Sequence, residues 1–338
     1  MESIWFYLLY FVLFLILAIK LKKQPRKKFN LPPSPPSFPI IGHLHLLRRP
    51  PLHRTFNNLA EKYGPVISIR LGSRLAVIVS SSAAAEECLT KNDIVLANRP
   101  PFANGRYLQY NCTTLAAASY GDHWRHLRKL CTIEIFSTTR LNSFRDIRKD
   151  EVKNLLTKVL HDSRNGSGKV VLRPMFLDMN FNNVLRMITG KKYDGEDAKE
   201  NAEEARMFRE MMQEFSELTT VTNLGDLFPI LEWADVRIVK KMSRVGKKMD
   251  AFFQRLVDAH RADNKDRNAM IDHLLALQRE EPEYYTDEII KGLILCFEVE
   301  RIGEEEIEMK EKAMTLMQRA NPLEVKCKAR PCLSKFLS

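Results

Sequence analysis

The chain has 338 residues, a formal net charge of +11, a hydrophobic fraction of 45% and a charged fraction of 28%. This length allows one large domain or two ordinary ones, and the composition excludes a largely disordered chain. A basic cluster between Lys20 and Lys28 supplies much of the charge excess, so the excess does not indicate nucleic-acid binding. The cysteines lack the short spacings of a zinc site or a disulfide framework, which favours free thiols. They are Cys88, Cys112, Cys131, Cys296, Cys327 and Cys332.

The first predicted element is an apolar helix that precedes the basic cluster. Residues 3–19 contain no charged side chain, and a helix of about 20 apolar residues spans a bilayer. A cleaved signal peptide is the alternative, but it needs positive charge before the apolar run and a small-residue cleavage site after it. We therefore expect a single-pass transmembrane signal anchor over residues 1–20. The positive-inside rule then places the rest of the chain in the cytosol.

A proline-rich segment follows the basic cluster. Residues 32–39 contain five prolines, which exclude a helix and favour a stiff polyproline conformation. A flexible linker or an SH3-type ligand is the alternative. Because the segment lies between the basic cluster and a folded region, we expect residues 21–42 to form a basic, proline-rich hinge.

The rest of the chain reads as a small sheet followed by many helices. Residues 66–71 and 75–79 alternate around a Gly-Ser-Arg turn, which predicts a β-hairpin. Apolar periodicity then predicts a series of helices. They cover residues 54–63, 82–89, 124–136, 145–160, 180–187, 201–217, 236–260, 270–277 and 286–295. The predicted fold class is mainly α with a small β-sheet, after the N-terminal transmembrane helix.

Several segments, in collinear order, resemble those of one family. They are residues 32–42, Lys62-Tyr63-Gly64-Pro65, Ala97-Asn98-Arg99-Pro100, Tyr120-Gly121-Asp122-His123-Trp124-Arg125-His126-Leu127-Arg128-Lys129, Met187-Ile188-Thr189-Gly190-Lys191-Lys192-Tyr193 and residues 286–293. Together they resemble the microsomal cytochromes P450 of plants, in particular the flavonoid and isoflavonoid hydroxylases. The resemblance implies a partial cytochrome P450 fold on the endoplasmic reticulum membrane. It also implies haem, O2, a small aromatic substrate and an NADPH-cytochrome reductase as redox partner.

Trp124 and Arg128 are the candidate cofactor-binding residues. They are four residues apart, so both project from one face of a helix, where an indole N–H and a guanidinium can donate to one anion. From spacing alone, a core tryptophan beside a surface arginine is the better interpretation, and the resemblance of the surrounding Tyr120-Gly121-Asp122 segment reverses that balance. In the family that this segment resembles, the anion is a haem propionate.

The resemblance breaks where the iron ligand belongs. A cytochrome P450 holds its iron by a cysteine thiolate, within the pattern Phe-x-x-Gly-x-Arg-x-Cys-x-Gly. No cysteine here has that setting, and Cys332 has only the preceding Arg-x, so no metal ligand and no catalytic residue is predicted. Beyond Leu295 the oxygen-handling motif of the family's central helix is also missing. Residues 43–295 thus resemble the N-terminal part of the domain, and residues 296–338 a C-terminal remnant, as after an internal deletion.

Two short Glu-x-x-Arg matches are not taken as the family's structural motif, because any helix rich in Glu and Arg contains them. They begin at Glu203 and Glu298. Phe102, Tyr107, Leu108 and Leu115 are candidates to face a substrate, and each is as easily core packing.

Three functions remain open. The chain is an inactive, truncated relative of a haem-thiolate monooxygenase, an active one with another axial ligand, or a non-enzymatic membrane-anchored interaction protein. Because partner helices are missing, we expect residues 124–136 and 286–295 to expose apolar surface.

Overall fold

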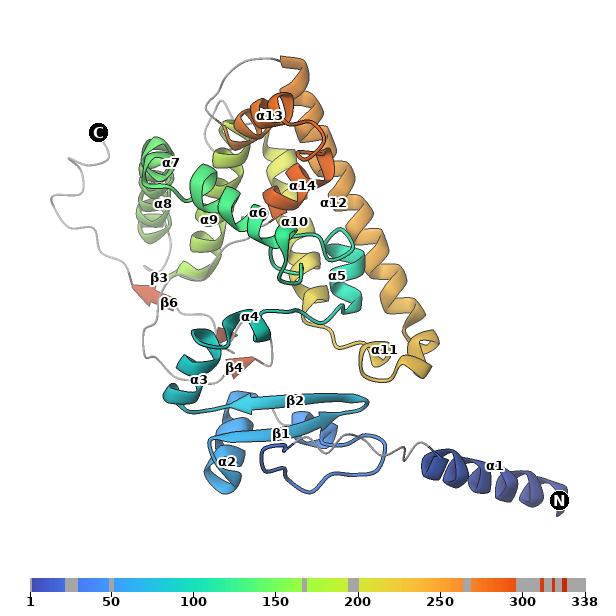
Figure 1. Cartoon of the computed structure of the whole chain (residues 1–338). Coiled ribbons are helices and arrows are strands. Elements are labelled where there is room, and N and C mark those ends of the chain that lie inside the picture. Colours follow the sequence, from blue (N-terminus) through green and yellow to red (C-terminus); the bar gives the residue numbers. More distant parts are fainter. Residues whose placement is uncertain are drawn as a thin grey trace.

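The computed structural model describes residues 2–21, 30–48, 52–165, 169–193, 201–263 and 269–295, together with the strand segments 311–312, 318–319 and 324–326. Helices dominate these ranges, and a small antiparallel hairpin lies at one end of the molecule (Figure 1). The predicted mainly α class with a small sheet is therefore confirmed.

The helices follow one another along most of the chain. Their bounds are α1 (Glu2–Leu21), η1 (Leu44–Arg48), α2 (Leu52–Tyr63), α3 (Ser82–Leu89), α4 (Asp93–Leu96), α5 (Ala103–Leu108), α6 (Asp122–Leu130), η2 (Cys131–Ile135), α7 (Thr138–Ser143), α8 (Arg145–Asn165), α9 (Leu172–Thr189), α10 (Ala202–Thr219), α11 (Leu224–Leu227), η4 (Pro229–Asp235), α12 (Val236–Asp263), α13 (Met270–Glu280) and α14 (Asp287–Leu295). The strands are β1 (Val66–Leu71), β2 (Arg74–Val79), β3 (Lys169–Val171), β4 (Glu311–Lys312), β5 (Gln318–Arg319) and β6 (Glu324–Lys326).

The predicted N-terminal helix is present as α1. The side chains from Trp5 to Leu15 are exposed along it. Within the described ranges, no helix is long and apolar enough to cross a membrane, so the predicted transmembrane anchor is not confirmed.

The proline-rich segment lies along β1 of the β1–β2 hairpin and is hydrogen-bonded to it. Ser68 donates from its N–H to Pro33 O and from Oγ to Pro32 O, both at 2.9 Å. The buried His43 continues this attachment, because its Nδ1 accepts from the N–H of Arg70 at 2.7 Å. Residues 31–42 contain no helix, as predicted. Among the described residues no strand pairs with the free edge of β2, where Leu75 and Val77 are each 49% exposed.

Two further strand pairs are present, and the first of them joins distant parts of the chain. β3 pairs with β6 antiparallel, and β4 pairs with β5. β6 lies within residues 296–338, the segment that resembles a C-terminal remnant of the domain. Most of residues 296–338, including three of the cysteines, lies outside the described residues.

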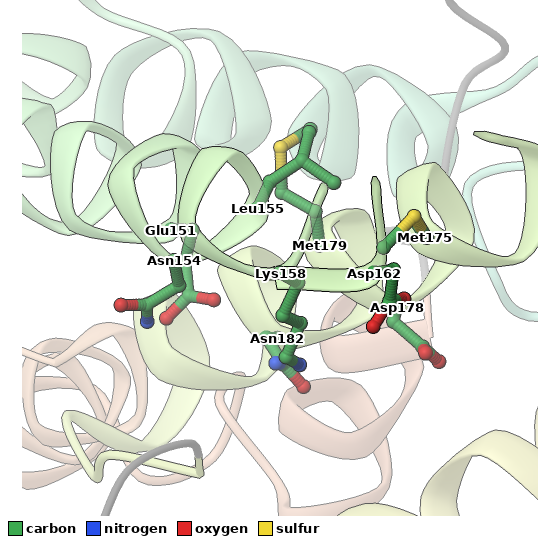
Figure 2. A pocket seen from close by; sticks show the side chains of 9 residues that line it. All are labelled: Glu151, Asn154, Leu155, Lys158, Asp162, Met175, Asp178, Met179 and Asn182. Carbon is green, nitrogen blue, oxygen red and sulfur yellow. The ribbon is translucent and has the colours of Figure 1, made fainter. Parts of the chain in front are cut away.

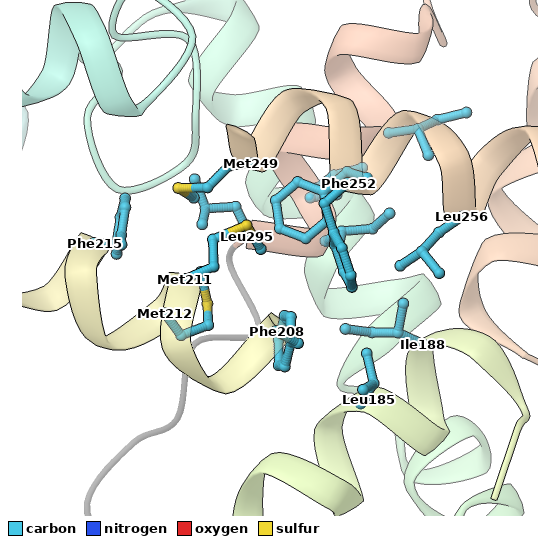
Figure 3. Close-up of a cluster of buried hydrophobic side chains, with 14 of the residues drawn as sticks. Leu185, Ile188, Phe208, Met211, Met212, Phe215, Met249, Phe252, Leu256 and Leu295 are labelled. Atoms are coloured by element: carbon cyan, nitrogen blue, oxygen red, sulfur yellow. The ribbon is translucent and has the colours of Figure 1, made fainter. Parts of the chain in front are cut away.

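One apolar core holds the later helices together. Side chains from α9, α10, α12 and α14 interdigitate there, and Phe208 stacks on Phe252 with the ring centroids 5.9 Å apart (Figure 3). Core residues shown in the figure include Leu185, Ile188, Phe208, Met211, Met212, Phe215, Met249, Phe252, Leu256 and Leu295. The long helix α12 runs through this cluster and buries one face in it, since its buried residues recur at helical spacing from Met242 to His260.

The expectation that residues 286–295 expose apolar surface is wrong. Every residue from Ile290 to Leu295 is buried, and Leu293 is 1% exposed. α14 packs on α12, and its first residue, Asp287, is bonded to side chains of both α12 and α13. For residues 124–136 the expectation is partly confirmed, because Ile133 and Phe136 are 49% and 55% exposed.

Candidate functional site

The candidate site is built on α6 and the segment that precedes it. α6 begins after Gly121, whose backbone is extended, and carries Asp122 in its first turn, where a carboxylate stabilises a helix N-terminus. Leu127 and Leu130 face the core, and the opposite side of α6 is basic and exposed. Amphipathic spacing therefore fixes which side chains of α6 reach solvent.

Trp124 and Arg128 are brought together, as their spacing predicts. The Arg128 guanidinium carbon lies 5.5 Å from the centroid of the Trp124 ring, within cation–π range. The indole Nε1 donates to Leu115 O at 3.1 Å. This N–H is therefore used inside the protein, and Arg128, which is exposed, is the member of the pair that can meet an anion from outside.

Arg99 is a third member of the site that the sequence analysis did not single out. Its guanidinium carbon lies 5.3 Å from the Trp124 centroid, and its Nη1 donates to Ala97 O at 2.6 Å. Asn98 Oδ1 accepts from the N–H of Tyr120 at 3.1 Å. Two segments that each resemble a family motif, residues 97–100 and 120–129, thus meet in space. Their shared resemblance was the signal that could have linked Arg99 to Trp124.

The sequence pattern of the family Cytochrome P450 matches residues 32–300. The chain belongs to the cytochrome P450 family. It is 49% identical over 298 residues to cytochrome P450 81E8 of Medicago truncatula, covering 87% of this chain and 60% of that protein. An isoflavone 2'-hydroxylase of Glycyrrhiza echinata is 48% identical, with 85% of this chain and 57% of that protein covered. The predicted resemblance to the plant flavonoid-hydroxylase branch of cytochromes P450 is therefore confirmed.

This cytochrome P450 chain spans about three fifths of the length of the curated relatives it matches. An isoflavone 3'-hydroxylase of Medicago truncatula gives the same proportion, at 48% identity over 300 residues, 86% of this chain and 60% of that protein. The activities in these names are those of the longer proteins.

The family implies a haem, and the described cysteines do not fit its iron. Cys131 is 3% exposed within the apolar core. Cys112 is half-buried against α5, and burial raises the pKa of its thiol, although Arg106 acts in the opposite direction. A raised pKa favours the thiol, whereas iron needs the thiolate. Cys88 lies on the short surface helix α3. Within the described ranges no three His, Cys, Asp or Glu side chains form a metal cluster.

The residues proposed to face a substrate are mainly packing residues. Leu108 is 3% exposed in the core, and Leu115 packs against the same cluster. Phe102 lies under the guanidinium of Arg74, 4.9 Å from ring centroid to guanidinium carbon. Tyr107 is 39% exposed. The structure therefore favours the core interpretation for Leu108 and Leu115, and it gathers none of the four at a described cavity.

A hollow of about 300 Å³ lies between α8 and α9 (Figure 2). Its lining residues are Glu151, Asn154, Leu155, Lys158, Asp162, Met175, Asp178, Met179 and Asn182. Sites for aromatic ligands are mainly apolar, with few polar groups. Because carboxylates and amides dominate this lining, the hollow does not fit an aromatic substrate.

A strained loop contacts the middle of α14. Tyr110, Asn111 and Cys112 all have positive φ, between 48° and 63°. The Tyr110 hydroxyl is buried, and burial together with the nearby Asp250 carboxylate raises its pKa, so the phenol stays neutral. Lys291 Nζ lies 2.5 Å from Asp250 Oδ1 and 5.7 Å from the Tyr110 centroid. This cluster ties the loop to α12 and α14.

The Glu-x-x-Arg match at Glu203 is a surface ion pair. Arg206 Nη2 lies 2.6 Å from Glu203 Oε1, and both side chains are more than half exposed. This geometry supports its exclusion as a structural motif. The match at Glu298 lies outside the described residues.

Proposed function

We propose that this chain derives from a haem-thiolate monooxygenase that hydroxylates small aromatic plant metabolites such as flavonoids or isoflavonoids. Such an enzyme uses O2 and electrons from an NADPH-dependent reductase. We propose further that the chain itself, as a truncated form, does not carry out this reaction. The names of its relatives support the first part, and the missing axial cysteine pattern supports the second.

One observation carries the proposal. The segment around Trp124 is intact, and Arg99 and Arg128 both contact the Trp124 ring, whereas no described cysteine stands in the axial-ligand pattern of the family. Arg128 and Arg99 are the residues that would meet a haem propionate. Contacts to a propionate are peripheral and do not hold the iron.

The proposed organisation follows the four parts inferred from the sequence. Residues 1–20 form a membrane anchor and residues 21–42 a hinge, while residues 43–295 are the N-terminal part of the cytochrome P450 domain and residues 296–338 its C-terminal remnant. The uncharged stretch 3–19 followed by the basic cluster supports attachment to the endoplasmic reticulum membrane with the bulk of the chain in the cytosol.

A non-enzymatic, membrane-anchored interaction protein is the second candidate. The packing of the helices supports it, because α14 is buried against α12. Such a chain can persist as a folded scaffold. Both candidates lack catalysis, and they differ in whether the protein accumulates in cells.

The test is the spectrum of the expressed full chain, supplied with haem, reduced and exposed to carbon monoxide. We expect no thiolate-type band, and no hydroxylated product when the reductase, NADPH and an isoflavone are added. The isoflavone 2'-hydroxylase of Glycyrrhiza echinata is the positive control. A thiolate-type band that disappears on replacing one of the six cysteines would overturn the proposal and identify the ligand. The level of the endogenous chain in plant microsomes separates the two candidates.

A further inference from the structure

The hollow between α8 and α9 is lined by one face of each helix. On α8 the lining residues occupy positions i, i+3, i+4, i+7 and i+11 from Glu151 to Asp162, and on α9 positions i, i+3, i+4 and i+7 from Met175 to Asn182. Arg186, near the end of α9, pairs with Glu151, near the start of α8, so the two helices run antiparallel. The hollow therefore extends along both helices, from Glu151 at one end to Asp162 and Met175 at the other (Figure 2).

Two buried polar side chains at the floor of the hollow have unused hydrogen-bonding capacity. Asn182 is 4% exposed and lines the hollow, and its amide makes no hydrogen bond with any residue that the structure describes. Glu151 is 2% exposed and accepts from Arg186 through Oε1, whereas no described residue donates to its Oε2. A buried polar group without a partner costs free energy, so native proteins satisfy such groups with water or with a ligand. A hollow of about 300 Å³ has room for either.

Two further carboxylates lie at the rim of the hollow. The side chains of Asp162 and Asp178 are 55% and 48% exposed there. Asp162 Oδ1 lies 3.3 Å from His161 Nδ1, and Asp178 Oδ1 lies 3.3 Å from Arg209 Nη1. Because both contacts are open to solvent they are weak, and a carboxylate has two oxygens that can accept further hydrogen bonds. Of the nine described residues that line the hollow, Lys158 alone carries a positive charge.

The acidic groups at the two ends are too far apart to hold one metal ion. Glu151 and Asp162 are three helical turns apart on α8, about 16 Å along its axis. Within the described ranges, moreover, no three His, Cys, Asp or Glu side chains are placed to bind a metal. Leu155, Met175 and Met179 supply the apolar part of the lining. A chain of methylene groups that carries spaced ammonium groups matches this arrangement, since an ammonium donates three hydrogen bonds and methylenes pack on thioethers.

We propose that the hollow between α8 and α9 binds an aliphatic polyamine. One ammonium group donates to Asn182 Oδ1 and Glu151 Oε2 at the floor, and a second donates to Asp162 and Asp178 at the rim. The chain as a whole, with a net charge of +11, repels polyamines, so binding depends on this local group of carboxylates. A zwitterionic amino acid is the competing ligand, because its carboxylate could pair with Lys158. Three carboxylates against one lysine in the lining favour the polyamine. The site does not depend on the proposed chemistry.

The test measures binding of spermidine to the full chain in mild detergent by isothermal titration calorimetry. The wild-type chain should bind one equivalent in a saturable manner. The double variant Asp162→Asn and Asp178→Asn should weaken the affinity at least about tenfold, because charge-assisted hydrogen bonds are lost. The matched control is Asp146→Asn with Glu203→Gln. It changes the net charge equally and removes two exposed carboxylates that also contact a cation but lie outside the hollow, so the affinity should stay almost unchanged.

Two single variants probe the floor and the ligand class. Asn182→Leu replaces the amide by an apolar side chain of similar size and should also weaken spermidine binding, whereas Lys158→Gln should strengthen it by removing a like charge. The absence of saturable binding, or equal effects of the two double variants, would overturn the proposal and leave the hollow to water. Equal binding of Mg²⁺ would overturn it in favour of a metal site. Binding of L-leucine that Lys158→Gln abolishes, without binding of spermidine, would overturn it in favour of a zwitterion. These titrations contain no haem, so their outcome is independent of the carbon monoxide spectrum.

Discussion

Arg186 Nη1 lies 2.6 Å from Glu151 Oε1, and the two side chains are 8% and 2% exposed. This ion pair joins α9 to α8 beside the hollow between them, and Asp150 adds a second carboxylate at 3.1 Å from Arg186 Nη2. A buried charge that loses its partner is far more costly than an exposed one. Removing either partner of this pair should therefore lower the free energy of unfolding.

The first prediction concerns that pair. Arg186→Met should lower the free energy of unfolding by about 3 kcal/mol, because Glu151 is left charged and buried. Urea unfolding of the full chain in mild detergent measures the change. The control is Arg206→Met, which removes a comparable cation from an exposed pair and should change the free energy of unfolding much less. Adding Glu151→Leu to Arg186→Met should restore most of the loss. Equal effects of the two single variants would contradict this.

The second prediction is a pH dependence at Asp287. Hydrogen bonds from Arg261 above all, with Gln278 and Gln254, hold the pKa of this carboxyl well below its usual range. Its stabilising contribution is therefore full above the unfolded pKa of about 4 and is lost as the pH falls toward the folded pKa. Asp287→Asn should cost about 1 kcal/mol at neutral pH, a figure kept small because the side chain is a third exposed.

The difference between wild type and Asp287→Asn should shrink as the pH falls below about 4. Unfolding measured across the acid range checks this. The control is Asp146→Asn, whose carboxyl is 91% exposed and 3.7 Å from Lys149. A difference for Asp287→Asn that stays constant with pH would show that the carboxylate charge is not what stabilises this contact.

The third prediction concerns Gly246 in α12. A Cβ at this position would lie 2.2 Å from the carbonyl oxygen of Tyr107 at the end of α5, so one of the two helices must shift. Gly246→Ala should therefore lower the free energy of unfolding by about 2 kcal/mol, although alanine is the better helix former. Gly121→Ala, where a Cβ meets nothing within 4 Å, is the control. A stabilising Gly246→Ala would mean that α5 moves aside freely.

The fourth prediction tests the contact between the two family motifs. A double-mutant cycle of Arg99→Ala and Trp124→Leu should give a coupling energy of about 0.5–1 kcal/mol, as expected for a partly exposed cation–π pair. Arg125→Ala in place of Arg99→Ala is the control, because Arg125 contacts Tyr120 and Asp122 instead. If the two cycles give the same coupling, the Arg99 contact does not join the motifs.

The long helices could be predicted because their apolar residues recur at helical spacing. α12 was expected over residues 236–260 and runs Val236–Asp263. α9 begins earlier than the expected residue 180, at Leu172, because Pro174 falls in its first turn, where proline is tolerated. The helices α4, α5, α7 and α11 were missed, since four to six residues are too few to show a period.

Contacts between distant segments were less accessible to sequence reasoning. The spacing of Trp124 and Arg128 predicts a shared face, and the structure confirms that they meet. It does not predict that Leu115 O accepts the indole N–H or that Arg99 approaches the same ring. Nor does it predict the burial of α14, which follows from packing on α12 rather than from the segment's own pattern.

The free edge of β2 has a consequence for handling the protein. Its outer backbone groups have no strand partner among the described residues, and Leu75 and Val77 stand half exposed beside them. Such an edge templates pairing with any extended chain of suitable sequence, including another copy. Pairing of two copies through β2 would be bimolecular, so dilution should favour the monomer.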